Sequence, residues 1–145
     1  MKLLFTCLIS IAFLIPVATA RSEDAAAKLT PQTQNGVHFV SGGVGKREQA
    51  AIDEMQSDYN VRVTLSDPAG RYLTGVELSI ETNDGKRLVQ TTTKGPIFLA
   101  KLDAGRYALR ASQPSRMTER RVFDVPHNRK DHVRLFVTMP KEAPE

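Results

Sequence analysis

From residue 61 onwards, apolar and polar side chains alternate along the chain. A period of two places the apolar side chains on one face of a β-strand, and turn residues separate the runs at intervals of roughly 8 to 12 residues. The pattern predicts a mainly β fold, a seven-stranded antiparallel β-sandwich over residues 61–139 that is preceded by one short α-helix. The seven predicted strands are residues 61–65, 76–80, 87–93, 97–102, 106–112, 117–125 and 133–137.

Two of these runs meet at the sequence Leu-Asp-Ala-Gly of residues 102–105. Phe98 and Ala100 alternate into this turn, and Tyr107 and Leu109 alternate away from it, which predicts a β-hairpin over residues 97–112. We expect the Tyr107 ring to enter the core and its hydroxyl to reach a nearby backbone group. A second hairpin is predicted at Asn-Asp-Gly, residues 83–85, because this sequence is typical of tight hairpin turns.

Residues 46–59 change to the period of a helix, with the apolar side chains of Ala51, Ile52, Met55 and Tyr59 on one face. A short strand over residues 37–41 and a glycine-rich turn precede this helix. A helix of about 12 residues is marginal in water by itself, so we expect its apolar face to pack on the sandwich. Residues 37–60 are therefore predicted to be a unit that covers part of the sheet.

The strand that begins at residue 97 is apolar on both faces. Ile97 and Leu99 point away from the side chains that enter the core. Either the helix or a partner protein covers this second face, and the sequence leaves both possibilities open. The last strand differs, because Arg134 and Phe136 are predicted to face outward. The alternating residues Val133, Leu135 and Val137 are predicted to face inward.

The first 20 residues have the features of a secretory signal peptide: Lys2, an apolar stretch over residues 3–15 and an Ala-Thr-Ala cleavage sequence that ends at Ala20. We expect cleavage near Ala20 and a periplasmic or secreted protein that meets the membrane only through this cleaved segment. Residues 21–36 are predicted to be a flexible tether and residues 140–145 a disordered tail. Cys7 is the single cysteine, so the mature chain would form no disulfide.

The formal net charge of +4 comes from basic residues that are scattered along the chain. No basic stretch interleaved with aromatic residues is present, so we expect no nucleic-acid partner. Arg106, Arg110 and Arg134 are candidates for a basic strip on an outer face. Together with Ile97 and Leu99 they form the predicted partner-contact surface. The expected partner is an unknown envelope protein or an anionic polymer, and the chain itself is expected to be a monomer.

The residue pattern predicts no catalytic, metal or cofactor site. The mature chain would have no thiol, and no Gly-x-Ser-x-Gly elbow surrounds a serine. The glycines of residues 42–45 do not have the spacing of a phosphate-binding loop. His127 and His132 flank the last turn, but a metal site needs three or four ligands at a defined spacing.

Residues 102–109, Leu-Asp-Ala-Gly-Arg-Tyr-Ala-Leu, resemble the Leu-x-x-Gly-x-Tyr-x-Leu signature of carboxypeptidase regulatory-like domains, which are small transthyretin-like β-sandwiches of envelope and surface proteins. The resemblance extends over residues 61–137 and implies an accessory module without peptidase activity. The predicted function is therefore a non-enzymatic binding or structural module of the bacterial cell envelope. The alternative is a small transthyretin-like hydrolase with a His/Arg site, for which His38 and His132 are the candidates.

Overall fold

The computed structural model describes residues 29–128 and 130–142. The predicted signal peptide, residues 21–28 of the predicted tether and residues 143–145 of the predicted tail lie outside the described residues. The described chain consists of β-strands in two sheets, one helix, α1 (Gly45–Met55), and a short 3-10 helix, η1 (Gln56–Asp58). The expectation of a mainly β fold with two sheets and one short helix is confirmed.

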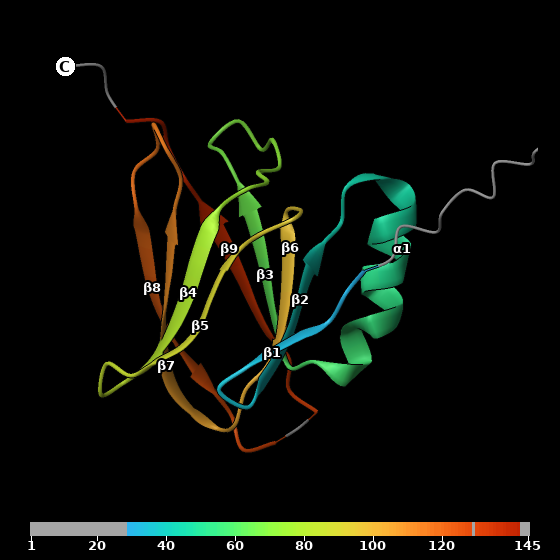
Figure 1. The fold of residues 1–145 in the computed structure, drawn as a ribbon, viewed down its shortest axis with the longest axis vertical. Helices are drawn as coiled ribbons and strands as arrows, with labels where there is room; N and C mark the ends of the chain where they lie inside the picture. Colours follow the sequence, from blue (N-terminus) through green and yellow to red (C-terminus); the bar gives the residue numbers. More distant parts are fainter. Residues whose placement is uncertain (1–28, 129, 143–145) are drawn as a thin grey trace, which may run out of the picture.

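Within residues 29–128 and 130–142, nine strands form the two sheets, where the sequence predicted seven. The five-stranded sheet has the order β1-β2-β6-β3-β9 and the four-stranded sheet the order β5-β4-β7-β8 (Figure 1). The two strands outside the predicted seven lie at the N-terminal side of α1: β2 corresponds to the short strand predicted over residues 37–41, and β1 was not predicted. The bounds are β1 (Gln32–Gln34), β2 (Val37–Gly42), β3 (Val61–Ser66), β4 (Glu77–Thr82), β5 (Arg87–Thr92), β6 (Ile97–Lys101), β7 (Gly105–Ser112), β8 (Glu119–Val125) and β9 (Val133–Thr138).

The direction of one strand pair differs from the prediction. β9 runs parallel to β3, with Val61 opposite Val133 and Ser66 opposite Thr138, so the sandwich is not antiparallel throughout. The reason is that alternation determines the face on which each side chain lies but carries no information about the direction of the neighbouring strand. Between β3 and β9 the chain crosses to β4 and β5, returns to the five-stranded sheet as β6 and crosses again to β7 and β8.

Both ends of the described chain are more ordered than the sequence suggested. Residues 32–34, expected within a flexible tether, form β1 and pair antiparallel with β2. Residues 141 and 142, expected within a disordered tail, are also paired: Lys141 forms an isolated bridge with Arg116, and the Glu142 N–H donates to the Ser115 carbonyl oxygen at 3.1 Å. Backbone partners at the sandwich rim therefore hold these segments, which have few apolar residues of their own.

The predicted hairpin over residues 97–112 is wrong, because its two strands belong to different sheets. β6 pairs with β2 and β3, whereas β7 pairs with β4 and β8. Leu102 is buried where the chain crosses between the sheets, and the side chain of Asn60 binds its backbone N–H and C=O. The second predicted hairpin is present, since β4 and β5 are antiparallel neighbours joined by residues 83–86.

The main core lies between the two sheets. Its fully buried side chains include Leu65 and Phe98 from the five-stranded sheet and Ile80 and Leu109 from the four-stranded sheet. Tyr107 has the predicted position: its ring stacks on Phe123 with 5.9 Å between ring centroids, and its hydroxyl donates to the Asp103 carbonyl oxygen at 2.7 Å. The alternating residues thus form a continuous apolar layer, as the period of two predicts.

The helix α1 lies against the outer face of the five-stranded sheet (Figure 1), and a second apolar cluster lies between them. Ile52 of α1 is fully buried there, and Met55 is partly buried. The residues that they meet come from two neighbouring strands and from the segment after η1: Val40, Tyr59, Ile97 and Leu99. The helix therefore covers the second apolar face of β6.

The start of α1 is anchored by a carboxylate. Glu48 accepts hydrogen bonds from the backbone N–H groups of Gly43 and Val44, both at 2.9 Å. A negative charge in the first turn of a helix is favourable because the free N–H groups there carry partial positive charge. Glu48 offsets the unfavourable positive charge of Lys46 and Arg47 in the same turn.

Candidate binding face beside the helix

The structure separates the five residues of the predicted partner-contact surface. Ile97 is 7% exposed and Leu99 is 0% exposed, because α1 covers both of them. Leu99 is therefore not available to a partner, and only a small part of Ile97 reaches the surface. Arg106 and Arg110 lie on the four-stranded sheet and Arg134 lies on the five-stranded sheet, so the three arginines do not form one strip.

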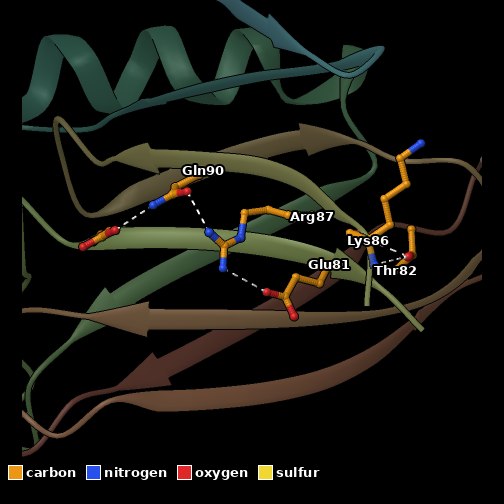
Figure 2. Close-up of polar contacts among 6 residues, drawn as sticks. Glu81, Thr82, Lys86, Arg87 and Gln90 are labelled. Atoms are coloured by element: carbon orange, nitrogen blue, oxygen red, sulfur yellow. Dashed lines mark hydrogen bonds and ion pairs between the residues drawn. The ribbon is translucent and has the colours of Figure 1, made fainter. Parts of the chain in front are cut away.

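On the outer face of the four-stranded sheet, most charged side chains have partners within the same face. Arg87 donates to the Gln90 side-chain oxygen at 2.9 Å and to the Glu81 carboxylate at 3.4 Å (Figure 2). Gln90 in turn donates to the Glu77 carboxylate at 2.9 Å. The predicted residue Arg106 is paired with Asp124 at 2.7 Å. Its guanidinium lowers the pKa of the Asp124 carboxyl, mainly through this hydrogen bond.

The outer face of the five-stranded sheet is covered only in part. α1 lies over β2 and β6, while the side chains of β3 and β9 remain beside it. A groove of about 360 Å³ follows this boundary, and we call it the α1–β9 groove. Its lining residues come from α1, η1, the strands β3, β6 and β9 and the loop after β3: Asp53, Gln56, Arg62, Thr64, Tyr72, Ile97, Arg134 and Phe136.

Two arginines lie side by side on this face, since Arg62 of β3 is the register partner of Arg134 of β9. The Arg62 guanidinium donates to the Asp53 carboxylate at 2.9 Å and also to the Gln56 side-chain oxygen. Within the described part of the chain, Arg134 has no hydrogen-bond or ion-pair partner. The groove therefore carries one positive charge that no neighbouring carboxylate compensates.

The two largest exposed apolar side chains of the described residues line the same groove. Phe136 is 71% exposed and Tyr72 is 62% exposed. Phe136 is the register partner of Thr64, which places it on the outer face as the alternation of the last strand predicts. Exposed aromatic rings that line a concave surface next to a charged group are typical of binding sites.

The loop that carries Tyr72 is held by a buried carboxylate. Asp67 is 4% exposed and accepts hydrogen bonds from the backbone N–H groups of Ala69 and Arg71, both at 2.9 Å. The Arg71 side chain adds an ion pair at 2.7 Å. These contacts, the Arg71 backbone N–H first, lower the pKa of Asp67 although burial acts in the opposite direction. Tyr72 then bridges to Ser66 at the end of β3, so the loop presents the ring from a fixed base.

The histidines do not come together. His38 lies on β2, where its Nδ1 atom is 2.8 Å from the Thr33 hydroxyl oxygen. His132 immediately precedes β9, which is three strands away in the sheet order, a separation of about 14 Å. His127 lines a different cavity of about 400 Å³ at one end of the sandwich. The described residues contain no group of three or more His, Cys, Asp or Glu side chains placed to hold a metal ion.

Of the residues that line the groove, sequence reasoning identified only Arg134 and Ile97 as candidates for partner contact. The sequence did give an indication for Phe136, because an aromatic residue at an outward position of a strand is a candidate for binding. Asp53 and Arg62 gave no such signal, because a solvent-exposed charge on a helix or strand is the ordinary case. Tyr72 lies outside the regular strands, so no periodicity indicates its direction.

No protein-family model matches this sequence, and no curated protein matches it. Two solved structures are similar to parts of the chain. The TIE protein of Bacillus anthracis is 18% identical with a TM-score of 0.45, and the match covers 56% of this chain and 17% of that one. BcpA, the major pilin subunit of Bacillus cereus, is 18% identical with a TM-score of 0.45, and the match covers 57% of this chain and 28% of that one. The chain thus spans less than a third of either protein.

Proposed function

We propose that the chain is a non-enzymatic binding module of the bacterial cell envelope, periplasmic or secreted, which holds its partner in the α1–β9 groove. The observation that carries this proposal is the position of Phe136 and Tyr72, both largely exposed, beside the unpaired Arg134. An apolar ring in water is unfavourable, and burying it against a partner would gain roughly 25 cal/mol for each Å² removed from solvent. The arginine would add specificity for an acidic group.

The location in the envelope is supported by the signal-peptide pattern of residues 1–20. The likeness of residues 102–109 to carboxypeptidase regulatory-like domains also supports an accessory module without catalysis. Among the described helices, none has the length and apolar character that a bilayer crossing requires.

The competing function is a small hydrolase with a His/Arg site. The separation of His38 from His132 and the Thr33 contact of His38 give it less support than the groove gives to binding. Incubating the purified protein with ureide and peptide substrates distinguishes the two functions. We expect no turnover, and turnover that His38→Ala or His132→Ala abolishes would replace the binding module by the hydrolase.

The binding face can be tested by site-specific photocrosslinking in the native envelope. The photoreactive residue p-benzoylphenylalanine is introduced in place of Phe136 or, as a matched control, in place of Val122, which is 55% exposed on the other sheet. We expect a discrete adduct from position 136 that is lost when Arg134→Glu is added, and no such adduct from position 122. Equal adducts from both positions, or none from position 136, would contradict the proposed face.

A further inference from the structure

The four edges of the two sheets are not equally protected against an added strand. β1 is the edge of the five-stranded sheet next to the helix, and it has only three residues. At the β5 edge, the Gln34 carboxamide donates to the Gln90 carbonyl oxygen at 3.0 Å and accepts from the Gln90 N–H at 2.9 Å. Asn35 donates to the Leu88 carbonyl oxygen at 3.0 Å. These side chains occupy the backbone groups that an added strand would need.

The β8 edge is protected by charge. Arg121 is the register partner of the core residue Leu109, so it stands at an inward position of the edge strand. It lies 3.9 Å from the Glu119 carboxylate. A charged side chain at such a position disfavours the addition of another strand, because the new strand would bury it.

Within the described residues, the backbone of β9 itself has none of these protections. The chain just beyond it is paired, because Met117 donates its N–H to the Pro140 carbonyl oxygen at 3.0 Å and Arg116 bridges Lys141, so the open edge ends at Thr138. The six residues of β9, Val-Arg-Leu-Phe-Val-Thr, contain no proline and no inward charge. Val133 donates its N–H to the Asn60 carbonyl oxygen at 2.8 Å and Met139 to that of Ser66 at 2.9 Å, so the odd-numbered residues pair with β3. The N–H and C=O groups of Arg134, Phe136 and Thr138 therefore face the open side.

We propose that β9 binds an extended peptide segment of a partner protein as a sixth strand of this sheet. The segment would place an acidic side chain beside Arg134 and an aromatic or β-branched side chain beside Phe136. The acidic side chain follows from charge complementarity, since Asp53 compensates Arg62 but no residue of the described chain compensates Arg134. Cross-strand pairs of these kinds stabilise a sheet. This proposal rests on the proposed function, for which it names the class of partner.

A defined peptide tests the proposal with the purified protein. The probe Thr-Val-Tyr-Val-Glu-Val would place Glu beside Arg134 and Tyr beside Phe136 if it added antiparallel, and the reversed sequence would do so if it added parallel. We expect one of the two peptides to slow amide hydrogen exchange at least fivefold at residues 134, 136 and 138 but not at 133, 135 and 137. Replacing Glu by Lys in the peptide should weaken its binding about tenfold. Uniform exchange, or no binding of either peptide, would overturn the proposal.

Thr138→Pro separates edge pairing from side-chain binding, with Thr138→Ala as its control. Proline removes one outward N–H and leaves the β3 pairing of residues 137 and 139 in place. We expect only the proline variant to lose peptide binding at least tenfold. If photocrosslinking at position 136 persists in Thr138→Pro, edge pairing is wrong but the proposed binding module stands. If the peptide binds but position 136 gives no adduct in the envelope, the proposed function is wrong. Protection of the same three amides by raised protein concentration alone would identify a second copy as the occupant and overturn the peptide proposal.

Discussion

The side-chain amide of Asn60 binds the backbone of Leu102 as a neighbouring strand would. Its Nδ2 atom donates to the Leu102 carbonyl oxygen at 2.7 Å, and its Oδ1 atom accepts from the Leu102 N–H at 2.9 Å. Leu102 is the buried residue at which the chain leaves β6 and crosses to the four-stranded sheet. Asn60 thus satisfies the two backbone groups that the crossing would otherwise leave without partners.

Replacing Asn60 by alanine should lower the free energy of unfolding by about 1–3 kcal/mol, because two buried backbone groups would lose their partners. The matched control is Gln34→Ala, which removes the same pair of amide bonds from the exposed backbone of Gln90, where water can replace them. Urea denaturation measures both variants. Equal losses in the two variants would show that the burial of Leu102 does not matter.

The crossing at Leu102 also shows what alternation can and cannot predict. Phe98 and Ala100 before the turn, and Tyr107 and Leu109 after it, face the core as predicted. A hairpin and a crossing between sheets give the same alternation, since in both cases the apolar side chains point into one layer. The partner that decides between them, Asn60, is 42 residues away in sequence. The turn at residues 83–85 was predictable because its own residues determine it.

The candidate site was predictable to a similar extent. Two-sided apolarity at Ile97 and Leu99 correctly indicated a covered face, and the apolar stripe of residues 51–59 indicated the element that covers it. A period of two relates residues within one strand, so it could not show that Arg106 and Arg134 belong to different sheets. The groove depends on where α1 ends across the sheet, which is a property of tertiary packing.

The hydrogen bond from Tyr107 to the Asp103 carbonyl oxygen makes Tyr107→Phe informative. At neutral pH we expect a loss of about 1 kcal/mol, the usual net value of such a bond. Burial, and then the Asp103 charge, raise the pKa of Tyr107. The contribution of the Tyr107 hydroxyl to the free energy of unfolding is therefore complete below the ordinary pKa of about 10. It is lost as the pH rises through the raised pKa.

The pH dependence of unfolding checks this assignment. Between about pH 9 and pH 11, the free energy of unfolding should fall less in Tyr107→Phe than in the parent protein. The control is Tyr72→Phe, because Tyr72 is exposed. We expect the control to stay within about 0.5 kcal/mol of the parent at pH 7. An unchanged alkaline slope in Tyr107→Phe would contradict the role of its hydroxyl.

Ile52 connects α1 to the sheet, because its fully buried side chain packs in the cluster with Val40 and Leu99. Ile52→Ala should cost about 2–5 kcal/mol and Ile52→Val about 0.5–1.5 kcal/mol, as for other buried isoleucines. Urea denaturation gives the loss, and the hydrogen exchange of residues 97 and 99 shows whether the helix has separated from β6. A loss below about 0.5 kcal/mol in Ile52→Ala would mean that the helix does not depend on this contact.

Asp67 should contribute to the acid dependence of stability. Its pKa is lowered in the folded protein, mainly by the Arg71 backbone N–H, so its contribution is complete above the ordinary pKa of about 3.9 and is lost as pH falls through the lowered value. Asp67→Asn should therefore show a smaller fall in urea midpoint between about pH 5 and pH 2 than the parent protein. Arg71→Ala removes the guanidinium but keeps the backbone N–H, which is the largest single cause of the lowered pKa, so we expect it to retain part of the acid dependence. If Arg71→Ala flattened the pH profile as much as Asp67→Asn, the ion pair rather than the backbone would be the main cause.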